Sequence, residues 1–170
     1  MLIVRHGLRS KTKRKSECPL PPQVAPSKSP MTESRSCARA TIALMPDPEE
    51  LVTPELTDAE RYVLNRGLVE WGGPAHCTEA MAIAMGFRSV GDLFVQAGRM
   101  IDALEQGCPL SRRDWTRALL ATEIVFVSDV LGSGPEWPIT TGLDDVETLR
   151  TLRGLQIKLA AVIVRRGAWT

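Results

Sequence analysis

The chain has 170 residues, of which 44% are hydrophobic and 24% charged, the balance of a soluble globular protein. The formal net charge of +1 conceals a split: residues 1–46 hold nine Lys/Arg and two acids, whereas residues 47–170 hold twelve Lys/Arg and eighteen Asp/Glu. This composition excludes a membrane span, a secreted disulfide-stapled miniprotein and a uniformly basic nucleic-acid-binding protein.

The first 46 residues form a basic, proline-rich segment, which we expect to be a disordered tail. Five prolines fall between residues 19 and 30, and proline disfavours helical backbone at its own position and at the residue before it. Six cations between residues 5 and 15 are typical of a tail that binds nucleic acid or another polyanion nonspecifically. We favour the alternative that the tail is dispensable, or that translation starts at Met31 or Met45.

Targeting and metal-binding patterns are missing from the sequence. No apolar run follows the N-terminal cations, so we expect no secretory signal peptide and a cytoplasmic protein. No two cysteines have Cys-x-x-Cys spacing, which predicts reduced thiols, no metal site and no cofactor; they are Cys18, Cys37, Cys77 and Cys108.

Residues 2–7, Leu-Ile-Val-Arg-His-Gly, resemble the strand and Arg-His-Gly opening of the histidine phosphatase superfamily. The resemblance implies His6 as the phosphoryl-accepting nucleophile and Arg5 as a phosphate ligand. That family has a second active-site histidine after a later strand, whereas His76 falls between helical segments here. We therefore favour a protein that is not an enzyme.

From residue 56 onward, helix-capping residues alternate with glycine and proline stops. Thr57 and Glu60 have the spacing of a capping box, in which each side chain bonds the other residue's backbone N–H. The further helices are predicted to begin after Thr78, Ser89, Ser111 and Asp144. The predicted stops are Gly72–Pro74, Gly86, Gly107 and residues 132–135, and Trp137 and Pro138 are assigned to a loop.

The helix predicted after Ser111 becomes apolar nearly all round between Ile124 and Leu131, so we expect it to be the buried centre of the fold. No convincing strand pattern is present. We predict an all-α protein, a compact bundle of about five helices, with residues 47–170 as a single helical domain.

Residues 56–107 carry a capped helix, the turn Gly72–Pro74, a second short helix and a third helix from Ser89. This arrangement resembles the helix-turn-helix half of MarR-type winged-helix regulators. The resemblance implies Ser89–Gln106 as a recognition helix whose N-terminal residues enter the major groove. The residues that would contact DNA, with the arginines displayed on one face, are Arg88, Ser89, Arg99, Arg112 and Arg113. The turn before Ser89 is one residue longer than the usual pattern, and no wing follows.

Two features of the C-terminal half are further candidates. Trp137 lies between Glu136 and Pro138 and is the tryptophan best placed at the surface to anchor a partner, but we favour packing of this loop tryptophan over the core. Glu123 and Asp129 are the acids expected to be most buried, and a buried carboxylate is a candidate functional group. We favour a structural role for both, paired with an arginine such as Arg117 or Arg150, or simple exposure to solvent.

These patterns favour a protein-interaction or regulatory module, which would bind a protein partner or self-associate. The alternative is a DNA-binding helix-turn-helix regulator. We expect no membrane and no small-molecule substrate. The arginine-rich, lysine-poor composition after residue 46 is compatible with a GC-rich bacterial genome.

Overall fold

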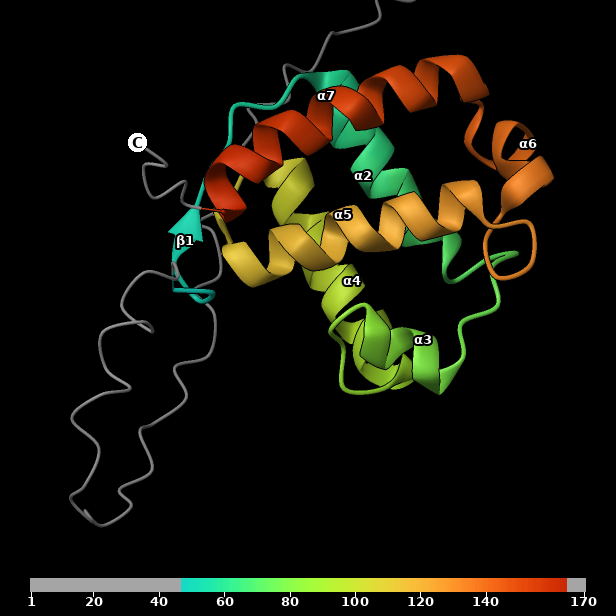
Figure 1. Cartoon of the computed structure of the whole chain (residues 1–170), viewed down its shortest axis with the longest axis horizontal. Coiled ribbons are helices and arrows are strands. Elements are labelled where there is room, and N and C mark those ends of the chain that lie inside the picture. The colour runs from blue at the N-terminus through green and yellow to red at the C-terminus, as the bar shows by residue number, and fades with distance from the viewer. Residues whose placement is uncertain (1–46, 165–170) are drawn as a thin grey trace, which may run out of the picture.

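The computed structural model describes residues 47–164, so the predicted tail and the candidates Arg5 and His6 lie outside the described residues (Figure 1). The elements in chain order are β1 (Leu51–Val52), α2 (Asp58–Glu70), α3 (Glu79–Ala84), α4 (Val90–Gln106), β2 (Leu110–Ser111), α5 (Arg112–Val127), the 3₁₀ turn η1 (Gly134–Glu136), α6 (Trp137–Thr141) and α7 (Asp145–Ile163). Helices dominate the described part of the chain, which confirms the all-α prediction.

The capping residues start the helices where the sequence predicts. Thr57 and Glu60 form the complete capping box at α2, in which the Thr57 N–H donates to Glu60 Oε2 (2.7 Å) and the Glu60 N–H to Thr57 Oγ1 (3.2 Å). The other predicted caps accept backbone N–H bonds in the same way; they are Thr78, Ser89, Ser111 and Asp144. These bonds satisfy N–H groups that have no partner inside a helix.

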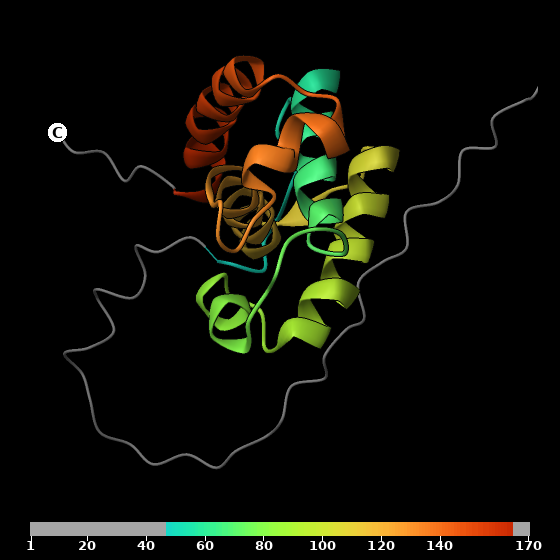
Figure 2. The same ribbon diagram turned by 90° about the vertical axis from the view of Figure 1, so that its right-hand side faces the viewer.

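The bundle has two inner and two outer helices. Helices α2 and α5 pack against each other most extensively, with α4 against α2 and α7 against α5 (Figures 1 and 2). The core is apolar, and its largest fully buried side chains include Trp71, Trp137, Leu64, Leu68, Met85, Leu93, Met100 and Leu155. In Figure 2, α4 lies at the edge of the bundle, with no described helix beyond it.

Three local features differ from the sequence prediction. A short antiparallel ladder pairs Leu51 with Ser111 and Val52 with Leu110, and it joins the chain before α2 to the start of α5. The expected loop at Trp137 is instead a 3₁₀ turn followed by the short helix α6. Helix α5 ends at Val127, because Ser128 adopts extended backbone and the chain folds back on the last turn of α5.

The C-terminal end of α5 is therefore more exposed than predicted. The Ser133 N–H donates to the Val125 carbonyl (2.8 Å), which places the returning chain against the end of the helix. Val127 is 71% exposed and Val130 is 82% exposed. The prediction that the helix is the buried centre of the fold across residues 124–131 is therefore wrong for its second half, although the inner face of α5, with Ala118, Ala121 and Val125, is buried.

Candidate functional site

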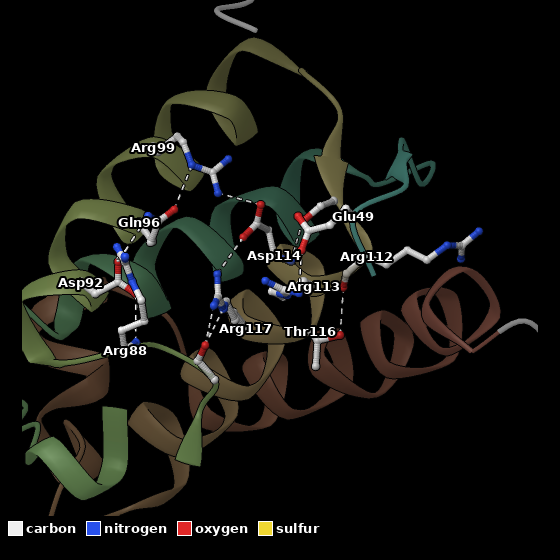
Figure 3. A network of polar contacts seen from close by, with 12 residues as sticks. Glu49, Arg88, Asp92, Gln96, Arg99, Arg112, Arg113, Asp114, Thr116 and Arg117 are labelled. Atoms are coloured by element: carbon white, nitrogen blue, oxygen red, sulfur yellow. Dashed lines mark hydrogen bonds and ion pairs between the residues drawn. The ribbon is translucent and has the colours of Figure 1, made fainter. Parts of the chain in front are cut away.

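Two of the predicted DNA-contacting arginines, Arg88 and Arg99, lie in a polar network that joins α4 to the start of α5 (Figure 3). Arg99 Nη2 lies 2.6 Å from Asp114 Oδ2, and Arg117 Nη1 lies 3.4 Å from Asp114 Oδ1. Arg117 also donates to the Gly86 carbonyl (2.9 Å) and stacks its guanidinium over the Phe87 ring. The network fixes the turn before α4 onto α5, which is a structural role.

Each arginine of the predicted DNA-contacting set is paired with a carboxylate of the same chain. Arg88 pairs with Asp92 (2.7 Å) and Arg113 with Glu49 (2.7 Å). Arg112 pairs with Glu50 (3.0 Å), and its side chain is only 10% exposed, so its predicted display on a DNA-binding face is wrong. The sequence did not indicate this, because Glu50 contacts Arg112 through the β1–β2 ladder rather than through local spacing.

Ser89 is the N-cap of α4, and its Oγ accepts a hydrogen bond from the Asp92 N–H (3.0 Å). The described residues hold ten Lys/Arg against eighteen Asp/Glu, a net charge of −8. Arg88, Ser89 and Asp92 thus lie together at the start of α4, where Arg88 and Asp92 neutralise each other's charge. DNA recognition by α4 remains a prediction.

The ion pair between Arg88 and Asp92 at the start of α4 is expected to weaken in acid. The bond from Arg88 outweighs burial and lowers the pKa of Asp92 from its ordinary 3.8 to about 2. A lowered folded-state pKa gives stability that is complete above the ordinary value and is lost as the pH falls from about 4 to 2. Because solvent screens the exposed Arg88, we expect this loss to be about 1 kcal/mol.

Urea unfolding at pH 7, 4 and 2.5 tests this expectation with Asp92→Asn, which cannot titrate. The variant should be less stable than wild type at pH 7, and the difference should shrink toward pH 2.5. Asp102→Asn is the matched control, because Asp102 is an exposed aspartate on the same helix. A difference between wild type and Asp92→Asn that stays constant with pH would contradict the lowered pKa.

Trp137 is buried, which agrees with the favoured interpretation that it packs over the core and excludes the candidate surface anchor. Its side chain is completely buried, and its Nε1 donates to Thr148 Oγ1 (3.0 Å) on α7. Its ring meets Phe126 edge-on, with 5.4 Å between the ring centroids. The physical reason is that η1 and α6 fold the indole inward, where a large apolar surface and one satisfied N–H are both accommodated.

The other predicted candidates do not form a reactive group. Asp129 is exposed, and Glu123 is half-buried and accepts a bond from Gln156 Nε2 (2.7 Å). The acid buried most deeply is Glu70, which accepts bonds from Ser133 Oγ (2.7 Å) and Thr140 Oγ1 (2.8 Å) and thereby holds η1 and α6 onto α2. Sequence spacing gave no signal for Glu70, because these partners lie more than 60 residues away.

The cysteine expectations are only partly met. Cys77 is a free thiol, and burial together with the nearby Glu79 raises its pKa, which opposes thiolate formation. The expectation of a reduced thiol is wrong for Cys108, which is disulfide-bonded. His76 is exposed next to Cys77, and between residues 47 and 164 no cluster of three or more His, Cys, Asp or Glu could hold a metal ion.

Within residues 47–164, a feature suited to binding is the groove between the C-terminal end of α5 and the N-terminal half of α7, called the α5–α7 groove below. Two adjoining hollows of about 500 and 400 Å³ share a floor of Phe126, Val127 and Leu149. Val127 is 71% exposed and Leu149 is 49% exposed. Concave apolar surface of this kind typically marks a binding site.

The polar residues around the α5–α7 groove are unevenly distributed. Asp129 and Asp145 line one hollow, and neither makes an ion pair with the described residues. Glu123, Arg153 and Gln156 line the other hollow. One end of the groove is thus acidic and uncompensated, whereas the other end is mixed.

No known protein family matches this chain, and neither a curated protein nor a solved structure matches it. Among residues 47–164, no helix has the length and apolar character needed to cross a membrane.

Proposed function

We propose that the protein is a protein-interaction module that binds a basic segment with apolar side chains of a partner protein in the α5–α7 groove. The observation that carries the proposal is the apolar floor of Phe126, Val127 and Leu149, the last two exposed, bordered by carboxylates that make no ion pair with the described residues. An amphipathic helix is the segment type that fits, because such a helix buries an apolar face in a groove between helices.

The charge of the groove decides which kind of segment is favoured. Asp129 and Asp145 stand at one end, and the described part of the chain carries a net charge of −8. Lysine or arginine on the segment would pair with these carboxylates, whereas acidic residues would be repelled. Apolar contact supplies most of the affinity, and the charges select the partner and its orientation.

DNA recognition through α4 is the second candidate, carried by the short helix α3, the turn and the capped helix α4. Of its arginines, Arg88 is 83% exposed and the other three are more covered. The two candidates use different surfaces. Variants of one surface therefore leave the other intact.

Calorimetric titration with two designed helical peptides tests the proposed function. Both peptides carry leucine on one face, and the other face carries lysine in one peptide and glutamate in the other. We expect the full chain to bind the lysine peptide with a Kd on the order of 10 μM and the glutamate peptide at least about ten-fold more weakly.

Uncharged substitutions separate groove binding from general attraction to an acidic protein. The double variant Val127→Gln/Leu149→Gln should weaken binding of the lysine peptide at least about ten-fold, because it removes apolar contact without changing charge. Ile157→Gln is the matched control, since Ile157 is an exposed α7 side chain that does not line the groove. Equal binding by the double variant and wild type would refute the proposal.

A further inference from the structure

The outer face of α4 is a second exposed apolar surface, independent of the α5–α7 groove. Phe94 is 47% exposed and Val95 is 70% exposed, although both lie in the middle of a well-packed helix. The inner face of the helix buries Leu93, Ala97, Met100 and Leu104. Helical periodicity places an outward strip on the opposite side, which consists of Gly91, Phe94, Val95, Gly98 and Asp102.

Gly98 in this strip has no explanation within the described fold. A Cβ added at Gly98 would meet no atom within 4 Å, so neighbouring helices do not require glycine there. Glycine in a helix interior costs about 0.5–1 kcal/mol relative to alanine. A position where another backbone or a large side chain must approach closely is one that needs glycine, and Phe94 and Val95 lie directly beside it.

We propose that a second copy of this chain covers this strip, with the two α4 helices packed antiparallel around a two-fold axis. In that arrangement Phe94 and Val95 of each copy lie against Gly98 of the other, so each strip supplies both the projecting side chains and the space for them. A symmetric dimer requires such self-complementarity.

The charges on α4 favour the same occupant and orientation. Arg88 lies just before the helix and its side chain is 83% exposed, so that it can meet a second carboxylate beside its own Asp92, and the exposed Asp102 and Glu105 lie near the other end. Antiparallel packing brings Arg88 of each copy beside the acidic end of the other. Parallel packing would place the two acidic ends together and the two Arg88 side chains together.

The dimer is expected to be weak and reversible. One helix pair buries less than the roughly 1,600 Å² of a standard stable interface. We therefore expect a Kd on the order of 10 μM for self-association.

Sedimentation equilibrium of the full chain between about 1 and 200 μM tests the proposal. Wild type should pass from monomer to dimer across this range. Val95→Glu and Gly98→Gln should each weaken association at least about ten-fold. Ile157→Glu on α7 is the matched control for a new surface carboxylate and should dimerise as wild type does.

Gly98→Gln also separates lost association from lost folding. Replacing an interior helix glycine should keep or raise the urea midpoint of the dilute monomer, while it fills the space that the second copy needs. A wild-type chain that stays monomeric up to about 200 μM would overturn the proposal. Unchanged dimerisation of both α4 variants would overturn it too.

Discussion

Replacing Trp137 with alanine is expected to lower the free energy of unfolding by about 3–5 kcal/mol. The indole is completely buried, packs edge-on against Phe126 and bonds Thr148 Oγ1, so truncation leaves a cavity between α5 and α7 and removes one buried hydrogen bond. Urea unfolding followed by far-ultraviolet circular dichroism measures the change. Phe126 should also lose its fixed position on the floor of the α5–α7 groove.

Trp137→Phe separates the two contributions of the indole. This variant keeps most of the ring volume and loses the bond to Thr148, so we expect a loss of about 1–2 kcal/mol. Leu51→Ala, at a half-exposed side chain, is the control for a generic truncation and should change stability far less. A Trp137→Ala loss below about 1 kcal/mol would show that the indole is not part of the core.

Replacing Gly67 with alanine is expected to destabilise the protein by about 1–3 kcal/mol. A Cβ at Gly67 on α2 would lie only 2.6 Å from the Cβ of Thr122 on α5, which is completely buried. Thr122 cannot move aside easily, because its Oγ1 donates to the Ala118 carbonyl (2.8 Å). The two inner helices would have to separate, and urea unfolding measures the cost.

The predicted loss of stability in Gly67→Ala is opposite in sign to the usual effect of replacing a helix glycine with alanine. A helix glycine without a close neighbour gains about 0.5–1 kcal/mol when it becomes alanine. Gly154→Ala on α7 is the matched control, because its added Cβ would meet Glu60 Oε1 at an ordinary 3.5 Å. Stabilisation by both substitutions would contradict the close approach of α2 and α5.

Sequence reasoning predicted the helices because their start signals are local. The capping box of Thr57 and Glu60 and the single caps at Ser89 and Asp144 each depend on residues within one helical turn. A backbone N–H at a helix start needs a partner, and a side chain two or three positions earlier supplies it. The MarR-type resemblance is not tested by the fold, since two capped helices joined at a turn occur in many helical proteins.

The features that the sequence did not predict depend on distant residues. Apolar residues continue on both sides of Ser128 and Asp129 as far as Leu131, so the sequence pattern did not place the end of α5 at Val127, where the chain turns back to the Val125 carbonyl. The sequence favoured burial of Trp137 but did not predict helix α6 or the contacts with Phe126 and Thr148 that surround the indole. The groove has the same origin, because Val127 from α5 and Leu149 from α7 become neighbours only in the folded bundle.

The measurement that tests the central claim most directly is a titration of the ¹⁵N-labelled full chain with the lysine peptide, followed by amide NMR shifts. Binding in the α5–α7 groove predicts that the largest shifts occur at Phe126, Val127, Val146 and Leu149, and that the glutamate peptide fails to produce them. Shifts centred on α4, or spread evenly over the acidic surface, would contradict the proposed function.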